Sequence, residues 1–439
     1  MPSILLSFVG QQDPVSDNTQ EDGSIVSLMR HLVAAGQTVR HVVLLHTAGT
    51  QERAELTQGW LMDAPFHLPK EAITLLLTNE GLSADPVNLL LAVDEARRGL
   101  EWAIAHRTAQ DILELNASSG TPVMKSAWSI LQAAGYVPQG RVWQVRNPKE
   151  MREGQERVFQ TNVDGLKNEF DLKVIKQQIK DYNYSGALET LKLTHFNHTV
   201  VAALLRYAHC RFSLDFDGAY AAIAKLGDLG TPPVDPRWHQ EIARLRQSRL
   251  DRRFLLREAY FNALIEYHNQ QYADFLVKLS RFQEGVLTYL VSDRLGRKLP
   301  ERYEECEAFW QFIQQFEQGN LYHFLQGYRF RGNPLTLQRF PNRPVLMAIV
   351  EYDPQFADVL QSIKALSEAC DRRNQVIHNF EGVSQIEDGA SLLQQMRAIL
   401  KKVAPGKLEN PFDALNQQLE TLLGTTARST ITASATGIL

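Results

Sequence analysis

The chain has 439 residues, of which 44% are hydrophobic and 22% charged, with a formal net charge of −4. These values are typical of a globular protein with two or three domains, and they exclude an overall basic field that would attract nucleic acid. No apolar stretch reaches membrane-spanning length and the opening apolar run is too short for a secretion signal, so we expect a cytoplasmic protein with no membrane partner.

The first part of the chain, residues 1–165, alternates apolar strands with helices. Strands are predicted at residues 3–9, 39–47, 72–78, 111–116, 142–145 and 157–161. Helices are predicted at residues 24–35, 51–62, 86–106 and 121–134. Strands rich in Leu, Ile and Val and separated by single helices predict an α/β domain, with a parallel sheet covered on both faces. Such sheets bind ligands at the carboxyl ends of their strands.

The loop after the first predicted strand reads Gly10-Gln11-Gln12-Asp13-Pro14. It lacks the G-x-G-x-x-G fingerprint of dinucleotide-binding proteins, and the chain has no P-loop. A nicotinamide or flavin enzyme is therefore disfavoured, and we expect no cofactor.

The turn after the fourth predicted strand has a composition that suits a phosphate. Gly120 permits a tight turn, Thr121 is a possible N-cap, and Pro122 suits the first helical position. The free N–H groups of such a helix start, together with the nearby hydroxyls, form a phosphate cradle with the helix dipole behind it. The alternative is an ordinary capped helix start without a ligand.

The remainder of the chain, residues 166–424, is predicted to be helical. Helices are predicted at residues 172–182, 187–193, 200–211, 218–226, 237–246, 255–269, 272–295, 302–316, 356–376, 391–403 and 411–423. Residues 327–343 read as an irregular insertion whose arginines either hold an RNA backbone or form a solvated loop. The small polar residues of the tail, 425–439, predict disorder.

A cluster of polar and charged residues lies at the end of the helix predicted up to residue 376. The apolar positions Val359, Ile363, Leu366, Cys370 and Ile377 define one buried face. Arg373 falls in the middle of this face, and Asn374 and His378, four residues apart, share the neighbouring strip. A guanidinium on an apolar face is costly unless it is paired or opens onto a wet cleft. The alternative is that these side chains cap the end of the helix.

No metal site is predicted. The cysteines Cys210, Cys306 and Cys370 stand alone, which also argues against a disulfide framework. His195 and His198 have no carboxylate or cysteine at a suitable ligand spacing.

These features together resemble a known family. The strand–Ser-Ser-Gly-Thr-Pro-x-Met–helix element at residues 118–124, in a six-strand α/β domain, resembles the CARF domain, a Rossmann-like nucleotide sensor of CRISPR-associated proteins. The segment Arg373-Asn374-x-x-x-His378 is similar to the R-x(4–6)-H signature of HEPN ribonucleases, and Arg372 offers a second register. A CARF domain followed by a helical HEPN domain is the arrangement of the type III CRISPR ancillary ribonucleases of the Csm and Csx group.

The resemblance implies a metal-independent endoribonuclease of antiviral defence that cuts single-stranded RNA. His378 would move a proton near neutral pH, Arg373 would stabilise the phosphoryl charge, and Asn374 would orient the phosphate or the imidazole. Attack by the 2′-hydroxyl of RNA would leave a 2′,3′-cyclic phosphate. The resemblance also implies a homodimer in which two such sets meet.

The resemblance further implies cyclic oligoadenylate as an allosteric activator bound by the CARF dimer. Its expected contacts are Gly10, Gln11, Gln12, Asn116, Ser118, Ser119, Gly120 and Thr121. A hydroxyl of Ser119 or Thr121 is a candidate for slow cleavage of the ring. The ring size and the RNA sequence preference stay open. The alternative function is a non-catalytic CARF sensor whose helical half binds a protein or RNA partner.

Overall fold

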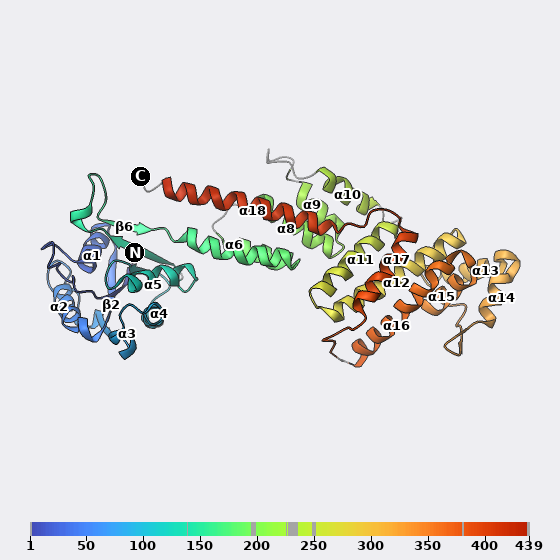
Figure 1. The fold of residues 1–439 in the computed structure, drawn as a ribbon, viewed down its shortest axis with the longest axis horizontal. Coiled ribbons are helices and arrows are strands. Elements are labelled where there is room, and N and C mark those ends of the chain that lie inside the picture. The colour runs from blue at the N-terminus through green and yellow to red at the C-terminus, as the bar shows by residue number, and fades with distance from the viewer. Residues whose placement is uncertain are drawn as a thin grey trace. The chain divides into compact units, whose positions relative to one another are not determined.

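Figure 1 presents a computed structural model of the chain. The structure describes the backbone of residues 2–436 except residues 138, 195–198, 225, 227–235, 248–251 and 380–381. The side chains of residues 164, 236, 237, 239, 372–379 and 425–436 also lie outside the description. The chain divides into two compact units, one made of residues 1–173, 193–196 and 424–439, the other of residues 174–192 and 197–423. The sequence places the boundary earlier, at residue 165.

The first unit is built on a six-stranded sheet (Figure 1). Its strands are β1 (Pro2–Phe8), β2 (Thr38–His46), β3 (Ile73–Leu77), β4 (Ile112–Asn116), β5 (Gly140–Val145) and β6 (Val158–Thr161). The order across the sheet is β3-β2-β1-β4-β5-β6. Neighbouring strands from β3 to β5 are parallel, as predicted, and β6 runs antiparallel to β5.

The antiparallel edge strand corrects the expectation of a wholly parallel sheet. The connection between β5 and β6, residues 146–157, contains only the short 3-10 helix Pro148–Glu150 and no crossover helix. Parallel strands require a crossover connection, whereas a strand that returns directly pairs antiparallel.

Helices cover both faces of this sheet, as the strand composition predicts. They are α1 (Ser24–Ala34), α2 (Gln51–Met62), α3 (Glu80–Ala84), α4 (Leu89–His106) and α5 (Pro122–Ala133). Alternate residues of β1 serve the two faces: Ile4, Leu6 and Phe8 pack with α4 and α5, and Leu5 packs with α1 and α2.

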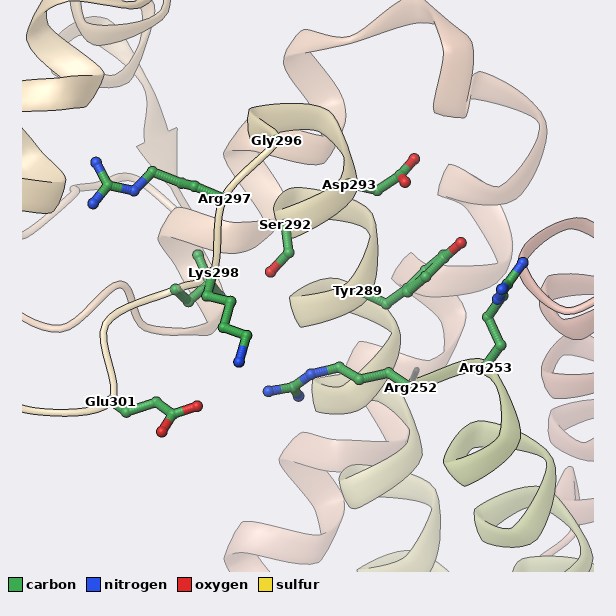
Figure 2. A pocket seen from close by; sticks show the side chains of 10 residues that line it. Arg252, Arg253, Tyr289, Ser292, Asp293, Gly296, Arg297, Lys298 and Glu301 are labelled. Atoms are coloured by element: carbon green, nitrogen blue, oxygen red, sulfur yellow. The ribbon is translucent and has the colours of Figure 1, made fainter. Parts of the chain in front are cut away.

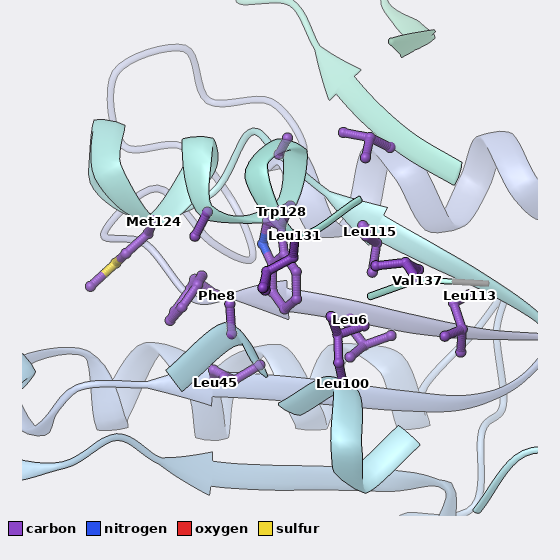
Figure 3. Close-up of a cluster of buried hydrophobic side chains, with 14 of the residues drawn as sticks. Leu6, Phe8, Leu45, Leu100, Leu113, Leu115, Met124, Trp128, Leu131 and Val137 are labelled. Carbon is purple, nitrogen blue, oxygen red and sulfur yellow. The ribbon is translucent and has the colours of Figure 1, made fainter. Parts of the chain in front are cut away.

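Figure 3 shows the core on the α5 face. The rings of Phe8 and Trp128 lie 5.4 Å apart, between β1 and α5. Both side chains are almost fully buried. Aromatic packing of this kind stabilises the contact beyond the area that it buries. The last residue of β1 and the helix that follows β4 are thereby held together.

The rest of the chain is helical. Its helices are α6 (Asp164–Lys180), α7 (Tyr184–Lys192), α8 (Thr199–Phe212), α9 (Phe216–Ala224), α10 (Pro236–Gln247), α11 (Arg252–His268), α12 (Tyr272–Leu295), α13 (Glu305–Gln315), α14 (Asn320–Gly327), α15 (Arg343–Tyr352), α16 (Ala357–Asn379), α17 (Gly389–Val403) and α18 (Pro411–Thr436). The backbone of α18 is helical to Thr436, in contrast to the expected disordered tail.

Among the described helices of this region, α14 and α15 were not predicted. In α15 six consecutive residues, 345–350, are all buried. A helix that is buried on every side has no polar face and therefore no helical period in its sequence. Its start is nevertheless regular, because the Asn342 side chain accepts a hydrogen bond from the Val345 N–H and Pro344 sits in the first turn.

The long helices α12 and α16 pack against each other in opposite directions. The Gln283 amide, in the middle of α12, donates to the Ile363 carbonyl oxygen at 3.0 Å, and Arg294, at the end of α12, forms an ion pair with Asp353, just before α16. The end of α16 therefore lies toward the beginning of α12. The predicted apolar face of α16 is buried at Val359, Ile363, Leu366 and Cys370.

Candidate functional site: the carboxyl edge of the sheet and the end of helix α16

The sheet has its topological switch point between β1 and β4. From β1 the chain proceeds to β2 and β3 on one side, and it returns to place β4 on the other side of β1. At such a switch point, α/β proteins commonly bind a ligand in a crevice outside the carboxyl ends of the strands. The loop after β1 and the turn after β4, both singled out in the sequence, lie at this position.

The two loops touch through their glycines. A Cβ atom added to Gly10 would lie 2.9 Å from the Gly120 nitrogen and 3.1 Å from Ser119 Oγ. Gly120 has φ +88°, a left-handed conformation that favours glycine. The structure therefore brings Gly10, Ser119 and Gly120 together. Gly10 is required by the close approach of the Gly120 backbone, and Gly120 by its positive φ and by the nearby Met124 and Phe8 side chains.

Asp13, which the sequence analysis did not select, links these loops. Its carboxylate accepts hydrogen bonds from the Ser119 hydroxyl, from the Gly10 N–H at 3.0 Å and from the Ile25 N–H at 3.3 Å. The residue is only 2% exposed, and burial raises the pKa of its carboxyl group. The sequence signal that could have found Asp13 is its place in the loop between β1 and α1, where an aspartate can accept hydrogen bonds from nearby backbone N–H groups.

Asn116 and Ser118 hold the turn after β4 from inside. The fully buried Asn116 amide donates to Ser7 Oγ at 3.0 Å and to Ser24 Oγ at 3.2 Å, and its oxygen accepts from the Ser118 N–H. Ser118 Oγ accepts a hydrogen bond from the Val145 N–H at 2.7 Å. The Asn116 side chain is therefore fully enclosed, whereas Ser118 is half-buried and ties the turn to β5.

The hydroxyls considered for ring cleavage are also occupied. Ser119 Oγ donates to Asp13, and Thr121 Oγ1 donates to the Pro86 carbonyl oxygen at 2.7 Å. Thr121 stands at the N-cap of α5 with Pro122 at the first helical position, as predicted.

Exposed polar side chains at this edge come from the loop after β1. Gln11 and Gln12 are exposed, with the Gln11 amide donating to the Gly49 carbonyl oxygen at 3.1 Å and Gln12 Oε1 accepting from Ser16 Oγ at 2.7 Å. Lys125, in the first turn of α5, lies close enough to lower the pKa of Asp13, although burial has the larger, opposite effect. Neutral amides, a helix N-terminus and one lysine form an edge suited to a polar ligand that carries phosphate.

The second predicted site falls on α16. The backbone that carries Arg372, Arg373, Asn374 and His378 is helical, within Ala357–Asn379. The side chains of these four residues lie outside the described residues. On a helix, residues 374 and 378 share one strip, and residue 371, seven positions before 378, lies on the same strip.

The irregular insertion reaches this part of α16. Residues 327–343 contain a small hairpin, β7 (Arg329–Phe330) and β8 (Asn333–Pro334). Arg331 at the tip of the hairpin and Arg343 at the start of α15 both form ion pairs with Asp371. Arg331 and Arg343, two of the arginines that were left between RNA binding and a solvated loop, thus adjoin the turn before Arg373.

A separate hollow lies at the end of α12 (Figure 2). Arg252 and Lys298 extend into the same open space, with Ser292 above their ends and Glu301 at the lower left. Its lining also includes Asp293. Because α12 and α16 are antiparallel, this hollow lies toward the start of α16, away from residues 373–378, and its charges are mixed.

Within the described residues, no group of three or more His, Cys, Asp or Glu side chains is arranged to hold a metal ion. The helices of that same part of the chain include none with the length and apolar character needed to cross a membrane.

The order of the elements defines a Rossmann-like α/β domain followed by a helical domain. No family model and no curated protein sequence matches the chain. Among solved structures, the chain is similar to Enterococcus italicus Csm6 bound to cyclic hexa-2′-fluoro-hexa-dAMP, with a TM-score of 0.60 and 15% identity over 96% of this chain and 100% of that one. The resemblance to the Csm group is confirmed at the level of the fold.

Proposed function

We propose that this chain is an endoribonuclease that cuts single-stranded RNA and is switched on by a cyclic oligoadenylate. The observation that carries the proposal is the likeness to Csm6 along almost the whole of both chains, because it covers the sheet and the helical region together. The motif Arg373-x(4)-His378 at the end of α16 adds the chemistry that a metal-independent ribonuclease needs.

In this mechanism the 2′-oxygen of the RNA attacks the adjacent phosphorus and loses its proton to a base. The bond from phosphorus to the 5′-oxygen breaks, and that oxygen takes up a proton, so the product carries a 2′,3′-cyclic phosphate. His378 handles a proton near neutral pH, Arg373 stabilises the charge on the phosphoryl oxygens, and Asn374 orients the phosphate or the imidazole. One chain supplies only three such catalytic residues, so the proposal includes a homodimer that brings the residues of two chains together.

The activator is proposed to bind at the crevice between β1 and β4. Gln11 and Gln12 offer exposed amides, and Gly10 and Gly120 allow close approach to the backbone. Because the ligand in the Csm6 structure is a cyclic hexanucleotide analogue, cyclic hexa-adenylate is the first ring to test. Ring binding changes the relative placement of the two catalytic sets, which is an allosteric coupling. Ring cleavage by Ser119 or Thr121 is not included, since Ser119 is buried and Thr121 donates to a main-chain carbonyl oxygen, which is not a base.

The test is RNA cleavage by the purified chain in EDTA, with cyclic tetra-adenylate, cyclic hexa-adenylate or no ring. We expect one ring to stimulate cutting strongly, and His378→Ala and Arg373→Ala to abolish it while ring binding and dimerisation persist. If RNA cutting is lost in Arg372→Ala and retained in Arg373→Ala, the arginine of the motif is Arg372 and not Arg373. A chain that binds a ring and never cuts RNA would be a sensor without catalysis, contrary to the proposal.

A further inference from the structure

Asp371 is the meeting point of two arginines from a segment far away in the chain. Arg331 and Arg343 both form ion pairs with its carboxylate. The Asp371 side chain is 26% exposed, and that of Arg331 is 56% exposed. Two guanidinium groups on one carboxylate leave an excess positive charge at an accessible place on the surface.

The position of this cluster on α16 relates it to the proposed catalytic residues. Asp371 precedes His378 by seven residues, which places both on the same strip of the helix about 10 Å apart along the axis. Asn374 lies between them on that strip. An RNA strand that follows this strip from His378 therefore runs into the two arginines.

The hairpin is built to present Arg331. The residue sits at the tip with φ +52°, followed by Gly332 with φ +82°. Its guanidinium lies 5.5 Å from the centre of the Phe330 ring, which supports it from the side. Arg343 is less exposed, at 26%, and is fixed at the start of α15. Guanidinium groups bind phosphate through paired hydrogen bonds, and a partly exposed pair that already shares one anion can accept a second.

We propose that Arg331 and Arg343 form a phosphate-binding subsite for the RNA strand, next to the cleavage position. This inference rests on the proposed ribonuclease function. Asp371 holds the two guanidinium groups in place before RNA arrives. Arg331 and Arg343 are thus substrate-binding residues and take no part in the proton transfers.

The test is RNA affinity against salt in the full chain with His378→Ala, so that bound RNA is not cut. Arg331→Ala should weaken binding about tenfold, as expected for one charged contact. The slope of log Kd against log salt concentration should fall by about 0.7, the value for one phosphate of a single strand. In the cutting enzyme the same substitution should raise KM and leave kcat within about twofold.

Arg329→Ala is the matched control. Arg329 stands on the same hairpin, and its guanidinium bonds only the carbonyl oxygens of Gln326, Gly327 and Tyr328 among the contacts described. It should change affinity and salt slope much less than Arg331→Ala. Equal effects of the two substitutions would mean a general loss of charge and overturn the subsite.

The outcomes also separate this inference from the function on which it rests. If the wild-type chain never cuts RNA but binds it in a way that depends on Arg331, the ribonuclease function is refuted and the subsite stands. If Arg331→Ala cuts RNA normally with an unchanged KM, the subsite is refuted and the ribonuclease function stands.

Discussion

Replacing Asp13 with asparagine should loosen the crevice at the carboxyl edge of the sheet. In the native chain one carboxylate oxygen accepts from the Gly10 N–H and the Ser119 hydroxyl, and the other accepts from the Ile25 N–H. Asparagine keeps the size of the side chain and supplies one acceptor oxygen. Its NH₂ group must face at least one donor that it cannot satisfy.

The expected loss of stability follows from the hydrogen-bond donor that the asparagine leaves without a partner. A buried donor left without a partner costs about 1–3 kcal/mol. The amide avoids the cost of burying a carboxylate, which is the effect that raises the pKa of Asp13. The net loss should therefore be about 1–2 kcal/mol in the free energy of unfolding. The loops around Gly10 and Gly120 should lose order with it, and the affinity for the ring should fall.

Urea unfolding at neutral pH and calorimetric titration with cyclic hexa-adenylate measure the two effects. Asp17→Asn is the matched control, because Asp17 stands in the same loop with a side chain 64% exposed and paired with Arg53. Loss of such a surface ion pair should change stability by less than about 1 kcal/mol. The reasoning is refuted if Asp13→Asn unfolds like the wild type and binds the ring with an unchanged Kd.

Three further predictions concern other parts of the molecule. Gly120→Val should abolish ring binding in the same titration, because its Cβ would lie 2.9 Å from Met124 Sδ and 3.2 Å from Phe8 Cβ at a φ of +88°. Arg40 hydrogen-bonds the buried Asp111 and lowers the pKa of that carboxyl group from 3.8 to about 2, so the pair stabilises the fold above pH 3.8 and loses this effect as the pH falls through about 2. Arg40→Gln should then cost about 1 kcal/mol at neutral pH, after allowance for solvent screening of the arginine, and much less below pH 2 in acid unfolding curves. Ring-stimulated cutting of RNA should persist in excess EDTA while DNA stays intact on gels, and restoration by added magnesium after chelation would contradict the mechanism.

Much of the first unit could be predicted because local patterns determine it. Runs such as Ile4–Val9 are long, apolar and bounded by turns, and each lies in or next to a strand of the observed sheet. The direction of β6 was not predictable in this way, since it depends on what connects two strands and not on either strand. The all-buried residues of α15 likewise offered no period to recognise.

The two loops of the proposed ring site could be selected from the sequence, whereas the hydrogen bonds within them could not. The sequence pointed to the loop after β1 and the turn after β4, and these loops do meet. It could not foresee that Ser119 would bond Asp13, 106 residues away, or that Asn116 would point inward to Ser7. Pairings over such separations depend on the tertiary fold. The same holds for Arg331, whose ion pair with Asp371 spans 40 residues.

The direction of strand β6 determines where a fluorescent dye can be attached to follow ring binding. Thr161, its last residue, pairs with Val142 near the start of β5, whereas Val158 pairs with Val145 at the end of β5. The chain therefore leaves the sheet at the edge opposite to the loops around Gly10 and Gly120, roughly one four-residue strand, or about 13 Å, away. A dye attached just after Thr161 would sit clear of an incoming ring and leave the mouth of the crevice unobstructed.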